Sequence, residues 1–263
     1  LWNTQRPADV QSIHRAYRQA GCDLITTNTF GASAVALDRH GLRPRAVELN
    51  RAGAAAARLA CGDDAWVLGD IGPFGGFLEP LGDMAAEDLR PVFAEQAQAL
   101  RAGGADAAVI ETMSDPAEVA VAIAAARSIG DWPIIATYAF AKSDTGFKTM
   151  MGIDVDEAIG RAIDAGATVV GANCGTNLSL EDYARLADQL VGAARGLPVI
   201  LQPNAGSPTT VDGKLVYHAS AREMAALARR LVAAGVRIIG GCCGTTPAML
   251  KEIARAAGDS IGA

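Results

Sequence analysis

Three cysteines are the residues of this chain whose type and spacing could do chemistry. Cys174 lies in the segment GANCGTN, residues 171–177, while Cys242 and Cys243 lie in GGCCGTT, residues 240–246. The apolar runs before both segments are typical of buried parallel strands, because Val and Ile follow one another without polar alternation. We therefore expect the three thiols at the carboxyl ends of strands, where catalytic groups of α/β sheets gather.

Three thiolates form a ligand set that suits zinc, which in catalytic sites leaves its fourth tetrahedral position to water or substrate. Neighbouring residues on a regular strand point to opposite faces, so Cys242 and Cys243 could share one ion only where the backbone leaves the regular pleat. The flanking glycines permit that departure. The alternative is that the three cysteines are ordinary core residues, which is the interpretation we give to Cys22 and Cys61 near helix ends.

A zinc site with three thiolate ligands favours transfer of an alkyl group to sulfur over hydrolysis. A substrate thiol in the fourth position would be drawn into its thiolate form. Three cysteine ligands would leave negative charge on the complex and so keep that sulfur electron-rich. Hydrolytic zinc sites more often use neutral imidazoles, and His14, His40 and His218 lie away from the predicted strand ends. We expect these histidines at the surface or in helix packing.

Other polar groups also follow predicted strands. Glu111 closes the run AAVIE, residues 107–111, and a buried carboxylate there needs a partner. We interpret it as the group that binds a cationic amino group of the substrate; a structural hydrogen bond to a neighbouring loop is the alternative. The segment TTNTFG, residues 26–31, offers hydroxyls and N–H groups to a carboxylate. Asn204, in PNAG at 203–206, would hydrogen-bond substrate, ligate a metal weakly, or serve as a turn residue.

Seven predicted strands alternate with eight predicted helices, without a linker or a break in composition. This pattern indicates a single α/β domain over residues 1–263, a (β/α)8 TIM-type barrel whose first strand is missing from this chain. An open doubly wound sheet is the alternative, but no Gly-x-Gly-x-x-Gly follows the early strands. The predicted strands are 23–29, 66–71, 107–111, 133–138, 168–172, 198–202 and 236–240. The predicted helices are 8–20, 44–60, 86–102, 116–129, 155–165, 180–194, 221–234 and 247–257.

The composition excludes several classes of function. With 263 residues, 50% hydrophobic and 5% aromatic, the chain is expected to fold around one aliphatic core. A net charge of -6 and a pI near 5.1 give no electrostatic reason to bind nucleic acid. No apolar stretch approaches the roughly 18 residues that span a bilayer. Five irregularly spaced cysteines do not form a secreted disulfide framework, so we predict a cytoplasmic protein without a membrane partner.

Six short segments together resemble the homocysteine S-methyltransferase family, and within it the homocysteine-binding domain of cobalamin-dependent methionine synthase. They are TNTFG (27–31), GDIGP (69–73), IET (110–112), NC (173–174), PNAG (203–206) and GGCCGTTP (240–247). The resemblance covers nearly the whole chain. It implies a (β/α)8 barrel in which Cys174, Cys242 and Cys243 hold the catalytic zinc and in which the thiolate of homocysteine accepts a methyl group to give methionine.

The resemblance also implies roles for further residues. Glu111, Asn173 and the backbone of Thr29 and Phe30 would bind the amino acid end of homocysteine. Asn204 would fill the fourth zinc position as a labile ligand before substrate arrives. Family members begin with a strand that carries an Asp-Gly-rich motif, which no segment of this chain supplies. Either the chain has been trimmed, which we favour, or it closes its barrel differently.

The methyl donor would be methylcobalamin on a partner corrinoid protein, or S-methylmethionine. Betaine is disfavoured, because Gly31 and Thr112 stand where the betaine enzyme has an aromatic pocket for a quaternary ammonium. One alternative function is a corrinoid-linked methyltransferase or demethylase that acts on another thiol or methylated substrate. An alternative from another class is a non-catalytic binding domain in which zinc only staples strand ends together.

Overall fold

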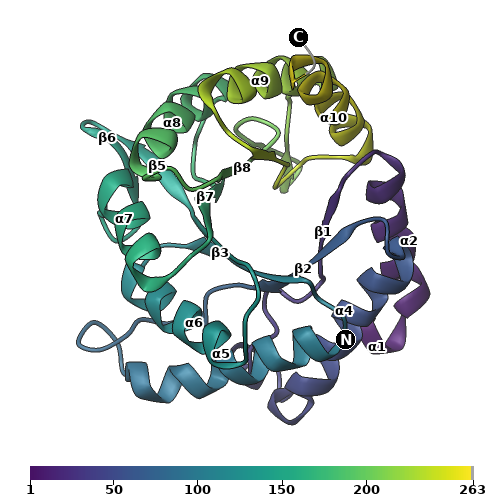
Figure 1. The fold of residues 1–263 in the computed structure, drawn as a ribbon, viewed down its shortest axis with the longest axis vertical. Helices are drawn as coiled ribbons and strands as arrows, with labels where there is room; N and C mark the ends of the chain where they lie inside the picture. The colour runs from purple at the N-terminus through teal and green to yellow at the C-terminus, as the bar shows by residue number, and fades with distance from the viewer. Residues whose placement is uncertain (262–263) are drawn as a thin grey trace.

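Strands and helices alternate around a ring in the computed structural model, which describes residues 1–261 (Figure 1). Within these residues, seven parallel strands form one curved sheet in the order β1-β2-β3-β4-β7-β8-β11, and the helices surround it. The predicted TIM-type barrel that lacks one strand is therefore confirmed. The strands are β1 (Leu24–Thr26), β2 (Trp66–Ile71), β3 (Ala107–Met113), β4 (Ile134–Tyr138), β7 (Val169–Cys174), β8 (Val199–Pro203) and β11 (Ile238–Ile239).

The helices form the outer layer of the ring. They are α1 (Trp2–Gln5), α2 (Pro7–Gln19), α3 (Ala34–Asp38), α4 (Ala46–Cys61), α5 (Ala86–Ala102), α6 (Pro116–Ser128), α7 (Val155–Ala165), α8 (Leu180–Ala193), α9 (Ala221–Ala234) and α10 (Pro247–Ile261), with a 3-10 turn η1 (Arg43–Arg45) before α4. Two hairpins, β5 (Phe140–Ser143) with β6 (Gly146–Thr149) and β9 (Thr209–Val211) with β10 (Lys214–Val216), extend the loops after β4 and β8. None of the helices within residues 1–261 is both long and apolar enough to cross a bilayer.

The predicted elements differ from the observed ones mainly at their ends. β1 and β11 are shorter than the predicted strands 23–29 and 236–240, because they are the two edges of the sheet and each pairs on one side only. Helix α10 runs past the predicted end at residue 257. Gly258 does not stop it, since a glycine inside a helix costs only about 1 kcal/mol. Helices α1 and α3 and both hairpins were not predicted.

The sheet does not close between β1 and β11 in the described residues. A cavity of about 1230 Å³ lies along this opening and is lined by apolar residues of β1, β11, α2 and α10. Three buried polar atoms on residues that line it, His14 Nε2, Gln202 Oε1 and Thr245 Oγ1, have no hydrogen-bond partner within the described part of the chain. Buried polar groups are normally satisfied, so these three atoms set the opening apart from the rest of the barrel wall.

The interior of the barrel has an apolar layer beneath a polar one. Leu68, Ala107, Val109, Ile135 and Ile200 pack together inside the sheet. Side chains two positions apart on a strand point to the same face, so the residues two places further along line the barrel nearer its carboxyl end. On β2, β3, β4 and β8 these residues are polar: Asp70, Glu111, Thr137 and Gln202. The strand pattern itself therefore places a polar chamber above an apolar floor.

Helix α6 holds the loop that follows β2. The helix begins after Asp115, whose side chain accepts the Ala117 N–H, with Pro116 in the first turn, and both residues suit these positions. One turn in, the buried Glu118 accepts the N–H of Phe74 at 2.7 Å. Burial raises the pKa of Glu118 from 4.5 to about 7. The carboxyl thus carries its proton over much of the acidic range while it holds the loop.

Glu118→Gln should stabilise the protein at high pH relative to low pH. The raised pKa means that the folded state keeps a proton which the unfolded chain loses, so Glu118 lowers stability as the pH rises from about 4.5 to about 7. The amide retains an acceptor for Phe74 and cannot ionise. The unfolding free energy of the variant, relative to that of the unaltered protein, should rise by up to about 3 kcal/mol between about pH 5 and about pH 8. Urea denaturation at the two pH values measures this difference. The exposed Glu157→Gln serves as control, and an equal effect of Glu118→Gln at both pH values would contradict the assignment.

Candidate metal and substrate site

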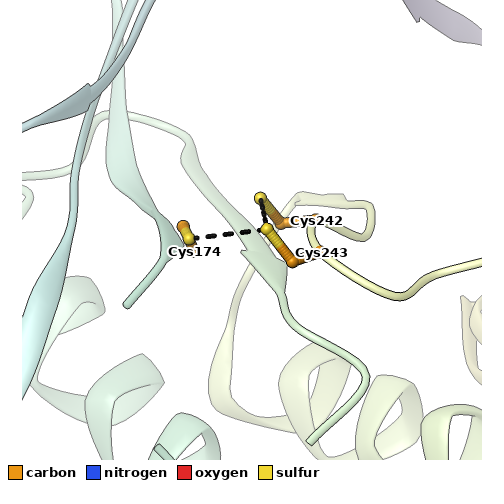
Figure 2. A group of neighbouring side chains, drawn as sticks. All are labelled: Cys174, Cys242 and Cys243. Atoms are coloured by element: carbon orange, nitrogen blue, oxygen red, sulfur yellow. Dashed lines mark hydrogen bonds between the residues drawn. The ribbon is translucent and has the colours of Figure 1, made fainter. Parts of the chain in front are cut away.

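The three cysteines of the glycine-rich segments converge at the carboxyl end of the sheet. Figure 2 shows Cys174, at the end of β7, facing Cys242 and Cys243 on the loop after β11. The sulfur of Cys243 lies 3.9 Å from that of Cys174 and 4.0 Å from that of Cys242, and all three sulfurs lie within 4.8 Å of one another. Zinc–sulfur bonds of about 2.3 Å in a tetrahedron place two sulfurs about 3.8 Å apart. The cluster therefore has the dimensions of a zinc–thiolate site.

The backbone leaves the regular pleat at both cysteine segments. β11 ends at Ile239, so Cys242 and Cys243 lie beyond the strand in a loop and turn, where neighbouring side chains need not point to opposite faces. Cys174 has a φ of 55°, a left-handed conformation that is uncommon for non-glycine residues. Gly244 has a φ of 78°, and a Cβ there would lie 2.3 Å from the ring of Tyr217. The glycines are therefore required by the close approach of the chain.

The electrostatics of the cluster favour a bound cation. Hydrogen bonds, the largest from Cys242, lower the pKa of the Cys174 thiol to about 6. The pKa of Cys242 is raised by its hydrogen bond to Cys174 and by burial, and that of Cys243 is raised by burial and by the negative charge of Cys174. Since the pKa values of Cys242 and Cys243 are raised, ionisation of all three thiols needs a metal ion, which can deprotonate coordinating thiols outright.

A second layer of groups fixes the segments that carry the cysteines. The Asn204 side chain accepts the Cys243 N–H at 3.1 Å and donates to Gly175 O at 3.1 Å. The Tyr183 hydroxyl donates to Cys174 O at 2.5 Å and accepts the Asn204 N–H at 3.2 Å. Asn204 thus lies beside the cluster, and its role as a labile ligand remains a prediction. Tyr183 was missed in the sequence, because a tyrosine inside a helix carries no local sign of its partners.

Glu111 and Asn173 lie side by side on the inner face of β3 and β7. The Asn173 amide donates to Glu111 Oε2 at 2.7 Å, and its oxygen accepts from Thr112 N at 2.8 Å and from Thr137 Oγ1 at 2.7 Å. Thr112 has a φ of 60°, where the pairing of β3 with β4 shifts register. Such a conformation is strained for a β-branched residue and often marks a functional site. The bend directs Glu111 toward its partner on β7.

Asp70 on β2 is a further member of the site that the sequence reasoning gave no role, although its GDIGP segment was noted. Its side chain is buried. Burial, then the charge of Glu111 and a hydrogen bond to it, raise the pKa of Asp70 well above its ordinary range. Burial also raises the pKa of Glu111, whereas the hydrogen bond from Asp70 lowers it. The signal that could have found Asp70 is its place two residues after Leu68 on an inward-facing strand pattern.

The segment after β1 lies against the same group of strands. The Thr29 N–H donates to Thr27 O at 3.0 Å, and the Thr29 hydroxyl donates to Asp70 O at 2.8 Å. Phe30 is exposed, and its carbonyl accepts the N–H of Gly72 at 3.1 Å. Since the Thr29 N–H is engaged, the Phe30 N–H is the donor of this pair that would face a substrate carboxylate. The role of this backbone remains a prediction.

The remaining histidines and cysteines lie outside the three-sulfur group, which contains no other Cys, His, Asp or Glu of the described residues. His14 is buried on α2, His40 is exposed, and His218 Nε2 lies 2.6 Å from Thr209 Oγ1 beside the β9–β10 hairpin. Cys22 and Cys61 are free thiols near α2 and at the end of α4. A metal in this cluster would therefore have three protein ligands of these types and an open fourth position.

Fold and site together define an α/β-barrel protein with a three-thiol metal-binding geometry at the carboxyl ends of its strands. The sequence profile of the family Homocysteine S-methyltransferase matches residues 1–257. The chain therefore belongs to the homocysteine S-methyltransferase family. This agrees with the resemblance inferred from the six short segments.

Individual relatives support the same family. The chain is 32% identical to the methionine synthase of Mycobacterium tuberculosis (strain ATCC 25618 / H37Rv) and 31% identical to that of Mycobacterium leprae (strain TN), each over 266 residues. These matches cover 97% of this chain and 22% of each relative, so the chain spans about a fifth of their length. The structure of the homocysteine methyltransferase MmuM from Escherichia coli, metallated form, superposes with a TM-score of 0.78 at 21% identity, covering 97% of this chain and 86% of that one. This likeness shows a shared fold.

Cys243→Ala should abolish metal binding, because two sulfurs cannot replace three in a tetrahedral site. We expect the zinc content of the purified protein to fall from about one ion per chain to near zero, measured by elemental analysis after gel filtration. Cys61→Ala, which removes a buried thiol outside the cluster, is the matched control and should keep its zinc. Full occupancy in Cys243→Ala would disprove the ligand assignment.

Tyr183→Phe should weaken metal binding without removing any ligand. The hydroxyl links the Cys174 carbonyl to the Asn204 N–H, and loss of such supporting groups typically lowers metal affinity about 10- to 100-fold. Competition with a chromophoric zinc chelator would measure the change. Tyr217→Phe, whose hydroxyl hydrogen-bonds to Cys243, provides a comparison on another ligand. An affinity of Tyr183→Phe equal to that of the unaltered protein would show that the linkage has no influence.

Proposed function

We propose that this protein is a zinc-dependent S-methyltransferase that moves a methyl group to the thiol of homocysteine and so forms methionine. The observation that carries the proposal is the three-sulfur cluster with zinc-like spacing and an open fourth corner within the described residues. Family membership supports the substrate class. The assignment of Cys174, Cys242 and Cys243 as ligands is part of the proposal.

The site residues would divide the work between metal and substrate. When bound, the zinc ion lowers the pKa of a thiol in the fourth position and so supplies a thiolate. Glu111, held by Asn173, binds the α-ammonium group, while the Thr29–Phe30 backbone receives the carboxylate. Asn204 would fill the fourth zinc position as a labile ligand until substrate arrives. In the transfer, the substrate sulfur loses its proton and forms a bond to the methyl carbon as the bond between that carbon and the donor breaks.

The donor in this proposal is methylcobalamin on a partner corrinoid protein, or S-methylmethionine. The five unpaired thiols support a reducing, cytoplasmic setting. A corrinoid-linked reaction on another thiol or methylated substrate remains the neighbouring alternative. A purely structural zinc site is the other, but such a site needs four permanent ligands, and the described residues offer only three of the usual types.

The decisive experiment supplies the zinc-loaded protein with homocysteine and, in parallel, methylcobalamin, S-methylmethionine or betaine. We expect methionine with one of the first two donors and none with betaine, detected by mass spectrometry, with zinc-depleted protein as the control. X-ray absorption should show a fourth zinc–sulfur contact on adding homocysteine. An unchanged zinc shell together with no methionine from any donor would refute the proposal.

A further inference from the structure

Asp70 and Glu111 lie on adjacent strands, β2 and β3, in the polar layer of the barrel interior. Asp70 is only 3% exposed, and its backbone is held at both ends. Its N–H donates to Thr27 Oγ1 at 2.9 Å, and its carbonyl accepts from Thr29 Oγ1 at 2.8 Å and from the Gln96 amide at 3.4 Å. This network fixes the Asp70 backbone, and its side chain lies on the same inward face of the sheet as that of Glu111 on the neighbouring strand.

The pair carries a single negative charge. Two ionised carboxylates in contact and out of water repel one another strongly, so one of them keeps its proton. The two side chains are hydrogen-bonded, and Glu111 Oε2 also accepts the Asn173 amide at 2.7 Å. That second hydrogen bond favours the ionised form of Glu111 and leaves the proton on the more deeply buried Asp70. No donor among the described residues reaches the buried Asp70 Oδ1, so an ionised Asp70 would leave that oxygen's charge uncompensated. Asp70 is then the donor and Glu111 the acceptor.

Glu111 is held from two sides. The Asn173 amide donates to Glu111 Oε2 at 2.7 Å, and Asp70 donates from the neighbouring strand. Unlike Asp70, the Glu111 side chain is half-buried, so a ligand can reach it. The remaining lone pairs of Glu111 form an acceptor of unit negative charge, which matches the unit positive charge of a primary ammonium group.

We propose that Asp70 is a positioning residue for the amino group of the substrate: as a neutral acid it donates a hydrogen bond to Glu111 and holds that carboxylate toward a primary ammonium. This inference rests on the proposed function, because it assumes a thiol substrate that is an amino acid. The inference goes beyond the proposed function because it assigns the selectivity for amino acid thiols over simple thiols to a pair of carboxyl groups that share one proton. Asp70 acts through Glu111 and makes no contact with the thiol.

The test compares homocysteine with 4-mercaptobutanoate, which has the same chain, thiol and carboxylate but no amino group. Asp70→Leu removes the donor while filling a similar volume. We expect it to weaken homocysteine binding about tenfold or more, the size expected for a hydrogen bond to a charged group, and to leave 4-mercaptobutanoate binding unchanged. Calorimetric titration of the zinc-loaded protein gives the dissociation constants, and steady-state rates should show the effect in KM with little change in kcat.

Asp70→Asn distinguishes a neutral donor from a negative charge, since the amide can also donate to Glu111. We expect it to bind homocysteine within about threefold of the unaltered protein, recovering most of what the leucine variant loses. Should the leucine variant fail to fold, this comparison still decides the matter, because a tenfold loss in Asp70→Asn would overturn the neutral-donor role. Asp156→Asn, exposed on α7, is the matched control and should equal the unaltered protein.

The outcomes separate this inference from the proposed function. If the unaltered protein binds homocysteine and forms methionine, but Asp70→Leu weakens both thiols equally or neither, the positioning role is wrong and the proposed function stands. If the unaltered protein neither binds homocysteine nor forms methionine with any donor, the proposed function fails first. A selective loss of homocysteine binding in Asp70→Leu, restored in Asp70→Asn, supports both.

Discussion

The mutual repulsion of three thiolates whose sulfur atoms lie within 4.8 Å of one another is the constraint on which this site depends. Thiols at this spacing ionise only in part, because each thiolate raises the pKa of its neighbours. A divalent cation removes the conflict and makes the arrangement favourable. The glycine-rich turns, the bridging Tyr183 hydroxyl and the Asn204 side chain all hold the backbone where the sulfurs meet. The segments around the cysteines are thus held in the arrangement that a bound ion would require.

A second conflict of like charges lies nearby, between Asp70 and Glu111, and the barrel resolves it with a proton rather than a metal. The two solutions suit the two ends of an amino acid thiol. In the proposed function, a cation would meet the developing thiolate, while the singly charged carboxyl pair would face the ammonium. Keeping the pair at one negative charge also limits repulsion with the cysteine cluster, whose charge contributes to the raised pKa of Glu111. Negative charge is therefore limited by a cation at the cysteine cluster in the proposed function, and by a shared proton at the Asp70–Glu111 pair.

The separation of an apolar layer from a polar layer inside the barrel follows from the alternation of side chains along each strand. Inward-facing residues change from apolar to polar within two positions of the carboxyl end of the strands, as from Leu68 to Asp70 and from Val109 to Glu111. The apolar floor stabilises the fold, and the polar layer carries the chemistry. Two residues of the sheet strands, Thr112 and Cys174, have left-handed backbone, and both lie near the carboxyl ends of their strands. There, the Asn173 side chain accepts the Thr112 N–H and the Tyr183 hydroxyl donates to Cys174 O, and these bonds hold the chain in place.

Local sequence patterns were sufficient to predict the alternation of strands and helices, the absence of one barrel strand, and the three cysteines and Glu111 at strand ends. These depend on periodicity and residue type, which neighbours in sequence determine. Only the tertiary structure showed that the sulfurs of Cys242 and Cys243 lie on one side, that Tyr183 reaches Cys174 from a helix, and that Asp70 meets Glu111. Such contacts depend on the register between strands and on how helices dock, and no local pattern encodes them.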